Sequence, residues 1–497
     1  MTAGEIIFLI AYFLTLAGLS FYGAHRYHTA WLYYRHRNDL PVPQEPTPGE
    51  SLPRVTIQLP VFNERYVVRR LIDHVCRIRY PRELLEIQVL DDSTDDTVEI
   101  AREAVAEWQA AGIDIVHVHR TDRTGFKAGA LQAGMQICKG DFIAVFDADF
   151  TPPADFLERT VPFFRDAGIG MVQARWDHIN RDYSLLTQCQ SILLDGHFIL
   201  EHTARNRSGR FFNFNGTAGI WRRTCIHEAG GWQHDTLTED LDLSYRAQLC
   251  GWRFVFLSDL LSPAEVPVEM TAFKTQQHRW AKGSIQVAKK LLPRILKSDL
   301  PFKVKMEAFT HLTNNIAYVL MILLSLMLPF SMGVRVDKGW YQTLLLDLPF
   351  FMGATVSVCA FYLLSQREAG GSWRQRITFL PFVLALGIGL AVNNAKATLE
   401  ALFGQESPFV RTPKLAVEGK GARLPTSTSY RGGRNVLAYV EISLGLYYTG
   451  TVIYSVMHGL WLALPFMLLF QFGFLYTGLM SRFQWSFVRR RSEQAPA

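Results

Sequence analysis

Residues 141–149 read DFIAVFDAD, and this stretch decides the fold. Its apolar run is short and is followed at once by carboxylates, as expected where a buried strand reaches the edge of a sheet. Alternation along an extended chain puts Asp147 and Asp149 on the same side, with the small residue Ala148 between them. Carboxylate oxygens so arranged suit Mg²⁺ or Mn²⁺, which bridge to phosphate oxygens. Solvated loops also show this D-x-D pattern, so the interpretation depends on the strand in front of it and on other carboxylates nearby.

Short apolar runs alternate with amphipathic stretches on the N-terminal side of this strand. The alternation predicts an α/β domain whose mostly parallel sheet is covered by helices on both faces. In such sheets, ligands bind outside the carboxyl ends of the strands. The predicted strands are 55–59, which ends before Pro60, 86–90, 113–118 and 141–146, and the predicted helices are 66–77, 96–111 and 126–137.

Polar residues follow the second and third of these strands. Asp91 and Asp92 come directly after strand 86–90 and could bind a base or ribose, or could instead form an Asx-turn. Lys127 lies at a predicted helix start between glycines that allow close backbone approach. It could contact a diphosphate or a base, and an ordinary surface lysine is an equally good interpretation of the spacing.

Two further motifs lie downstream. Thr238-Glu239-Asp240 opens a helical stretch, where acidic residues could stabilise the first turn or hold a general base for a hydroxyl group. Residues 276–280 read QQHRW. In this segment Arg279 is suited to binding phosphate, and Trp280 offers an apolar face to a sugar. Arginine and tryptophan also anchor helices at membrane interfaces, and both roles are compatible.

The composition points to a membrane protein. The chain has 497 residues, of which 49% are hydrophobic and only 19% charged, with a formal charge of +6. The positive charge could indicate nucleic-acid binding, but its location beside apolar segments favours the flanks of membrane spans. The apolar segments of near-span length are 6–22, 309–332, 344–364, 436–457 and 460–480.

Segment 379–403 is ambiguous, because its apolar half covers only about 14 residues, which is short for a span. If it crosses, the basic residues of 410–434 and the final Arg489, Arg490 and Arg491 lie outside; if it does not, every basic cluster is cytoplasmic. We therefore predict five spans and one interfacial helix, with the N-terminus outside and the catalytic domain in the cytoplasm. The predicted divisions are 1–24 (span), 25–53 (basic interfacial segment and linker), 54–297 (soluble domain), 298–365 (two spans), 366–435 (interfacial helix and loop), 436–481 (two spans) and 482–497 (basic tail).

The motifs in this order resemble the processive family 2 glycosyltransferases of the cellulose synthase superfamily. The paired aspartates, D-x-D, T-E-D and Q-x-x-R-W all precede membrane spans. The longer stretches FNGTAGIWR (214–222) and EAGGW (228–232) are most similar to the cellulose-synthase-like A and C subfamilies of mannan and glucan synthases. The resemblance covers about residues 54 to 480 and implies a GT-A fold. From the resemblance we expect neither the large plant insertions nor a PilZ domain.

The resemblance also implies roles for individual residues. Asp240, with Glu239 beside it, would be the catalytic base, and Asp149 with Asp147 would hold a divalent metal, Mg²⁺ or Mn²⁺. The nucleotide would be bound by Pro60, Phe62, Glu64, Asp91, Asp92, Lys127, Asp147, Gln276 and Arg279, and the acceptor by Trp280, Phe214, Asn215 and Gly216. Phe409, Arg411, Thr412 and Lys414 would form a gating loop over the donor, in which Arg411 replaces the usual valine.

The implied function is polymerisation of GDP-mannose or UDP-glucose into a β-1,4-linked mannan, glucomannan or glucan, with inversion and with export of the chain through the spans. The expected partners are a nucleoside-diphosphate sugar, the growing polysaccharide and the bilayer of a plasma or inner membrane, with no nucleic acid. A non-processive transferase that makes a glycolipid and a non-catalytic export partner remain alternatives. A glycoside hydrolase would explain neither the D-x-D nor the basic groups.

Overall fold

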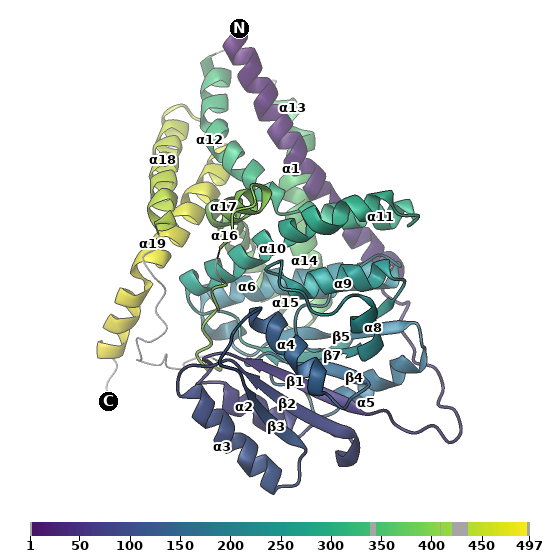
Figure 1. Ribbon diagram of the computed structural model, residues 1–497. Coiled ribbons are helices and arrows are strands. Elements are labelled where there is room, and N and C mark those ends of the chain that lie inside the picture. The colour runs from purple at the N-terminus through teal and green to yellow at the C-terminus, as the bar shows by residue number, and fades with distance from the viewer. Residues whose placement is uncertain (1, 338–343, 408, 420–435, 495–497) are drawn as a thin grey trace.

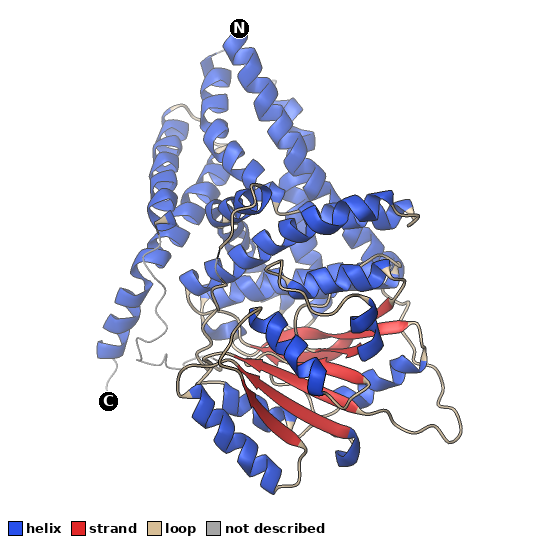
Figure 2. Ribbon diagram, in the orientation of Figure 1, coloured by secondary structure: helices blue, strands red, loops and turns tan. Residues whose placement is uncertain are grey.

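The computed structural model describes residues 2–337, 344–407, 409–419 and 436–494. A sheet lies at one end of the molecule and long apolar helices at the other (Figures 1 and 2). The sheet has seven strands in the order β3-β2-β1-β4-β6-β5-β7. The strands are β1 Val55–Val61, β2 Leu85–Asp91, β3 Ile115–His119, β4 Phe142–Val145, β5 Ile169–His178, β6 Gly219–Arg222 and β7 Arg253–Ala264.

The predicted mostly parallel sheet is confirmed. Strands β1, β2, β3 and β4 pair in parallel, as do β5 and β7, whereas β6 runs antiparallel to both β4 and β5. The predicted end of the first strand at Pro60 is wrong, because β1 continues to Val61. Pro60 pairs only with β2, since β4 pairs with β1 no further than Gln58, so the missing amide of proline breaks no second ladder.

Helices cover both faces of the sheet and bury one apolar core on each. The first core lies under α2 (Val68–Val75) and α3 (Thr97–Ala110) and includes Ile57 and Ile87. The second core lies under α4 (Phe126–Ile137), α8 (Arg223–Glu228) and α9 (Glu239–Leu249), and is filled by aromatic side chains such as Trp221. The four parallel strands therefore have a fixed carboxyl edge, at which polar side chains gather.

A helical segment connects the sheet to the apolar helices. Its helices are α6 Leu185–Asp195, the π-helix η4 Gly196–His202, α7 Thr203–Arg207, α10 Met270–Lys297 and α11 Phe302–Thr313. Lys274 on α10 forms a fully buried ion pair with Glu441, with 2.5 Å between Lys274 Nζ and Glu441 Oε1. Helix α10 also carries the QQHRW motif of residues 276–280. The same helix therefore contacts the apolar helices and presents this motif.

Within the part of the chain that the structure describes, four helices are long and apolar enough to cross a membrane. They cover Ala3–His36 (α1), Ile316–Val334 in α12 (Ile316–Asp337), Pro349–Ala369 and Leu464–Gln484 in α19 (Leu464–Gln494). A pair of helices, Trp373–Gly389 and Ala391–Leu402, bends by 41° and would make a fifth span if counted as one. The chain is thus built with several apolar helices of membrane-spanning length.

The helix bounds correct several sequence expectations. Helix α1 runs on to His36, so the basic segment after residue 24 continues the first span rather than following it. The predicted span 309–332 is divided, because α11 ends at Thr313 and α12 begins at Ile316. Segment 344–369 is one continuous run of α13 (Leu344–Phe351), η6 (Met352–Val356) and α14 (Ser357–Ala369).

Two predicted membrane segments differ in character from the rest. Helix α18 (Leu437–Met457) lies where span 436–457 was predicted, but it contains Glu441 and four tyrosines and is not among the four described helices that are long and apolar enough to cross a membrane. Segment 379–403 forms α16 (Leu380–Gly389) and α17 (Ala391–Leu402), and α17 buries the side chains of Asn393, Asn394 and Thr398. The basic clusters of 420–434 and 489–491 lie outside the residues whose side chains are described.

Candidate active site

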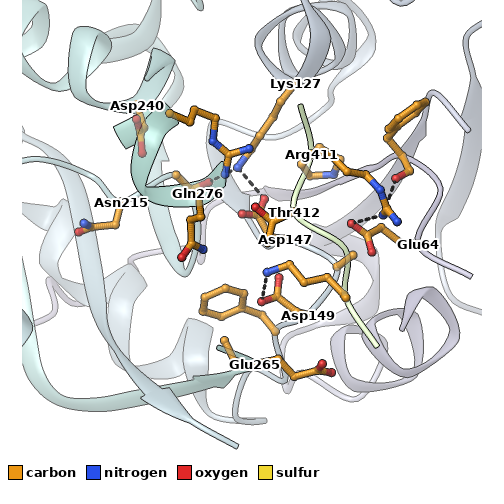
Figure 3. A pocket seen from close by; sticks show the side chains of 18 of the residues that line it. Glu64, Lys127, Asp147, Asp149, Asn215, Asp240, Glu265, Gln276, Arg411 and Thr412 are labelled. Atoms are coloured by element: carbon orange, nitrogen blue, oxygen red, sulfur yellow. Dashed lines mark hydrogen bonds and ion pairs between the residues drawn. The ribbon is translucent and has the colours of Figure 1, made fainter. Parts of the chain in front are cut away.

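One cavity opens at the carboxyl edge of the sheet, between β1, β4, α9 and α10. Its walls include all the predicted site residues except Asp91 and Phe214. The residues that line it are Pro60, Phe62, Glu64, Asp92, Lys127, Asp147, Asp149, Asn215, Gly216, Glu239, Asp240, Gln276, Arg279, Trp280, Phe409, Arg411, Thr412 and Lys414, together with Arg123, Trp176, His178, Thr238 and Glu265 among others. Segments from residue 60 to residue 414 therefore meet in one place, as Figure 3 shows.

Each carboxylate of the D-x-D pattern faces a lysine. Lys127 Nζ lies 2.5 Å from Asp147 Oδ1, and Lys414 Nζ lies 2.5 Å from Asp149 Oδ2 (Figure 3). Asp149 is almost fully buried, and Asp147 is partly exposed. Burial disfavours the charged lysines, but the neighbouring aspartates outweigh it and raise the pKa of both Lys127 and Lys414. The cavity thus contains two lysine–aspartate ion pairs, Lys127 with Asp147 and Lys414 with Asp149.

Asp240 lies in the first turn of α9 and faces the same cavity. Burial raises the pKa of the Asp240 carboxyl to about 7; the neighbouring Glu239 raises it further, and Lys127 opposes the shift. The Oδ1 atom of Asp240 accepts a hydrogen bond from the Leu241 amide at 2.8 Å, which fixes the orientation of the carboxyl. A carboxyl group held near neutrality beside a basic pair has the properties of a general base.

Thr238 does not cap this helix with its side chain, although the sequence allowed it. Its side chain instead packs against α10 at Gly283, where an added Cβ would lie 2.5 Å from Thr238 Oγ1. Close approach of α9 and α10 at this glycine brings Asp240 and the segment 276–280 to the same cavity.

Arg279 and Trp280 enter the cavity from α10. The guanidinium of Arg279 lies 4.8 Å from the centre of the Phe409 ring. Burial lowers the pKa of Arg279, and this effect is opposed by Glu239, Asp147 and Asp240. The half-buried guanidinium of Arg279 can therefore bind a phosphate group of a ligand that enters between it and these carboxylates.

The segment 409–418 lies across the cavity and is held at three points. Arg411 Nη1 lies 2.8 Å from Glu64 and donates to the Phe62 carbonyl at 3.0 Å. Lys414 binds Asp149. Arg70 pairs with both Glu418 and Glu265, at 2.6 Å each. This segment therefore closes one side of the site through charge pairs.

The two aspartates after β2 face different ways. Asp92 lines the cavity and is held by two hydrogen bonds from Arg120, at 2.7 and 2.6 Å. Asp91 does not line it, because its side chain is fully buried and accepts hydrogen bonds from His117 at 2.8 Å and from the Ser93 amide. The geometry places Asp92 at the cavity and gives Asp91 the turn that the sequence offered as the alternative.

Asp91, His117 and His119 bring possible metal-ligand atoms within 4.8 Å of one another. His117 and His119 project from the same side of edge strand β3. Both carboxylate oxygens of Asp91 are already used by hydrogen bonds to the Ser93 amide and to His117. The cluster is satisfied as it stands and orders the turn beside Asp92.

Phe214 does not line the cavity, contrary to the prediction. It was predicted at the acceptor, but its side chain is fully buried and packs against Trp221 and Trp232. The ring of Phe214, in the loop before β6, fills part of the second core, and the following Asn215 and Gly216 reach the cavity.

Sequence reasoning missed several residues. The guanidinium of Arg123 lies 3.3 Å from the centre of the Phe62 ring and lines the cavity. Arg120 orients Asp92, and Glu265 anchors segment 409–418. The proximity of Arg123 to Lys127 in the sequence was the only signal available for it, whereas Arg70 and Glu265 gave none.

The mostly parallel sheet, with a cavity at its carboxyl edge, defines a domain of the GT-A type. Residues 53–283 match the family model described as "Glycosyltransferase like family 2". The chain therefore carries a glycosyltransferase family 2 domain, as its motifs predicted.

Curated relatives cover about half of the chain. Glucomannan 4-beta-mannosyltransferase 1 of Oryza sativa subsp. japonica is 44% identical over 271 residues, which are 53% of this chain and 52% of the relative. Glucomannan 4-beta-mannosyltransferase 2 of Arabidopsis thaliana is 43% identical over 255 residues, 50% of this chain and 48% of the relative. The chain thus spans about half the length of the curated relatives that it matches.

A solved structure shares the fold. A mannosyltransferase from Pyrobaculum calidifontis, in complex with GDP-Man and Mn²⁺, aligns with a TM-score of 0.51 and 19% identity, over 79% of this chain and all of the other. At this identity the likeness concerns the fold alone.

Proposed function

We propose that the protein is an inverting hexosyltransferase that transfers mannose from GDP-mannose to the growing end of a β-1,4-linked mannan or glucomannan and exports the chain. The observation that carries this proposal is the meeting of Asp147, Asp149 and the half-buried Asp240 in one cavity with Arg279 and Trp280. The names of the curated relatives favour mannose. UDP-glucose is the second donor to be tested, because nucleobase and sugar contacts decide between the two.

The site fits a divalent metal. Asp147 and Asp149 offer oxygen ligands only, which suit Mg²⁺ or Mn²⁺. The ammonium groups of Lys127 and Lys414 already lie at these two carboxylates, so the site is built for positive charge. Asp149 would be the more direct ligand, with Asp147 beside it. When bound, the metal would neutralise the diphosphate as a Lewis acid.

The chain's own residues can perform the transfer. Asp240 takes the proton of the acceptor hydroxyl, and the resulting oxygen nucleophile attacks the anomeric carbon. The bond from that carbon to the diphosphate oxygen breaks, and its electron pair leaves with the nucleoside diphosphate. Arg279 and Lys127 balance the charge of the leaving group, and Trp280 stacks under the acceptor sugar. Attack from the side opposite the leaving group converts an α-linked donor into a β-linked product.

Transfer should become slower in acid because Asp240 acts only when ionised. Its pKa is raised to about 7, so the ionised fraction falls as the pH drops below this value. We expect kcat/KM to fall about tenfold per pH unit on the acidic side, whereas an ordinary aspartate with a pKa of about 3.9 would give a flat profile. A pH-rate profile between about pH 5 and 9 measures this, and a constant rate down to pH 5 would contradict the assignment.

Purified protein in detergent tests the function directly. Labelled GDP-mannose and UDP-glucose are supplied separately, with and without Mn²⁺ or Mg²⁺, and the product is digested with mannanase or β-glucanase. Metal-dependent polymer from GDP-mannose that mannanase degrades is the expected result. A labelled lipid without polymer would favour the non-processive glycolipid transferase. Donor binding without any product in the presence of an acceptor would favour a non-catalytic export partner.

We propose that α1, α12, the run 349–369, α18 and α19 cross the membrane, that the bent pair α16–α17 does not, and that the sheet domain is cytoplasmic. The buried polar side chains of α17 support a helix pair covered by protein rather than by lipid. Cysteines introduced at Thr2 and Glu406 should then be labelled from opposite sides of sealed vesicles. Labelling of both from one side would contradict this topology.

A further inference from the structure

Asn215, which lines the cavity, is held between two histidines. Its side-chain nitrogen lies 3.0 Å from His197 Nε2, and its side-chain oxygen is bonded to His202 Nε2. The other ring nitrogen of His197, Nδ1, lies 2.9 Å from the carboxylate of Glu201. The backbone amide of Asn215 is also fixed, by a 3.1 Å hydrogen bond to the Gln173 side chain.

The π-helix η4 makes this arrangement possible. His197 and His202 are five residues apart, a spacing that the i to i+5 turn of a π-helix brings to one side. In an α-helix of 3.6 residues per turn, the same two residues would project about 140° apart. In η4 their ring centres lie only 4.4 Å apart, and both reach Asn215. Single turns of π-helix in proteins are concentrated at functional sites.

The hydrogen bonds fix the protonation of the ring atoms. The Glu201 carboxylate only accepts, so His197 carries its hydrogen on Nδ1 and leaves Nε2 to accept from the Asn215 amide. The Asn215 oxygen then accepts from Nε2–H of His202. Among the described residues, this leaves His202 Nδ1 as a buried acceptor without a partner, whereas the flipped arrangement would leave an unpaired buried N–H, which is rare in proteins. Burial keeps the pKa of His202 well below its usual value, so it stays neutral.

His197, Glu201 and His202 together form a clamp on Asn215. This clamp acts on the part of the cavity wall that lies beside Asp240. Gly216 follows Asn215, has a φ of +81°, and is so close to Asp240 that an added Cβ would lie 3.0 Å from Asp240 Oδ2. Its carbonyl accepts from Lys127 Nζ at 2.8 Å. A shift of Asn215 therefore moves the backbone that Asp240 and Lys127 contact.

Packing alone does not account for the clamp. The side chains of His197 and Glu201 are 24% and 20% exposed, and Asn215 is among the residues that line the cavity. Apolar side chains would fill the same space, and they would not require hydrogen-bond partners as His197, Glu201 and His202 do. One N–H and one lone pair of the Asn215 amide remain available to a hydroxyl group in the cavity.

We infer that His197, Glu201 and His202 are positioning residues that hold Asn215 and Gly216 against the acceptor hydroxyl. This inference rests on the proposed transfer to a sugar acceptor and extends it to residues that contact neither donor nor metal. The clamp reaches the donor side only indirectly, through the hydrogen bond from Lys127 to the Gly216 carbonyl, and the pairing of Lys127 with Asp147 does not require it. Without the clamp, the donor still binds and water can still replace the sugar as the nucleophile, so hydrolysis of the nucleotide sugar continues while transfer fails.

Three variants test this. His197→Leu removes the acceptor for the Asn215 amide, whereas His197→Gln keeps an oxygen near the same place. His227→Leu, at an exposed position on α8, is the matched control. The assays measure donor binding, release of free sugar from the donor, polymer formation and the thermal unfolding midpoint of each purified protein.

We expect His197→Leu to lower polymer formation on the order of a hundredfold, as for a small misplacement of a reacting group, with donor affinity and hydrolysis close to wild type. His197→Gln should recover a large part of the loss, and His227→Leu should match the wild type. Equal losses of hydrolysis and transfer, or no loss of transfer, would overturn the inference. Polymer made by the wild type reports separately on the proposed function, because the clamp is judged from the ratio of hydrolysis to transfer in the variants.

Discussion

Asp240→Asn should lower the rate of sugar transfer by about 10² to 10⁴-fold, the usual contribution of a general base, with little change in donor affinity. The amide has nearly the shape of the carboxyl but accepts no proton from the acceptor hydroxyl. Asp240 is also the group whose pKa is raised toward neutrality in the cavity, as a base for a sugar hydroxyl requires. Initial rates with labelled donor, together with equilibrium binding of the nucleoside diphosphate, measure the two effects separately.

Asp235→Asn is the matched control, because Asp235 lies in the preceding loop, is exposed, and forms an ion pair with Lys290. Its rate should stay within about twofold of wild type, as for most surface substitutions. An Asp240→Asn protein that still transferred sugar at a tenth of the normal rate would remove Asp240 from the mechanism.

Asp149→Asn and Lys414→Met should change metal binding in opposite directions. Asp149 would be the more direct ligand, so its loss should weaken Mn²⁺ binding by at least about 100-fold, the upper range for residues that merely support a ligand. Lys414 holds its ammonium 2.5 Å from Asp149, where it competes with a cation in the empty site. Without this lysine, Mn²⁺ should bind more tightly in the absence of donor, while transfer falls because the diphosphate loses a positive partner.

Mn²⁺ titrations followed by electron paramagnetic resonance, without nucleotide, measure the affinity apart from activity. Asp259→Asn and Lys297→Met, both at exposed positions, serve as controls for the loss of one charge. Unchanged Mn²⁺ affinity in both site variants would show that the metal is held elsewhere. Weaker binding in Lys414→Met would show that the lysine supports the metal rather than competing with it.

Local patterns determined the first half of the sheet. Strands β1 and β2 alternate apolar with polar residues and β4 is a short continuous apolar run, and both patterns depend only on neighbours in the sequence. Helix α4 was predicted with its observed bounds, Phe126–Ile137, because a glycine and an apolar period define it locally. Strand β6 was not predicted, since its four residues pair in antiparallel fashion between β4 and β5 and gain their stability only from these distant partners.

The sequence did not predict in which direction individual side chains point. Asp91 and Asp92 are adjacent and chemically the same, yet one is buried under His117 and the other faces the cavity. Similarly, Phe214 fills the core although the next residue lines the site. Alternation along an extended chain requires such neighbours to differ, but only the position of the sheet within the domain decides which of the two is buried.

The sequence by itself determined the class of domain, the carboxylates at the strand ends and the presence of long apolar helices, because each depends on residues close together in the chain. Only the tertiary structure decided how Arg411 meets Glu64, how Lys414 meets Asp149, and how two histidines of a π-helix hold Asn215. These contacts join residues separated by up to several hundred positions. Their geometry follows from how the helices pack on the sheet, since no local propensity distinguishes a paired charge from a solvated one.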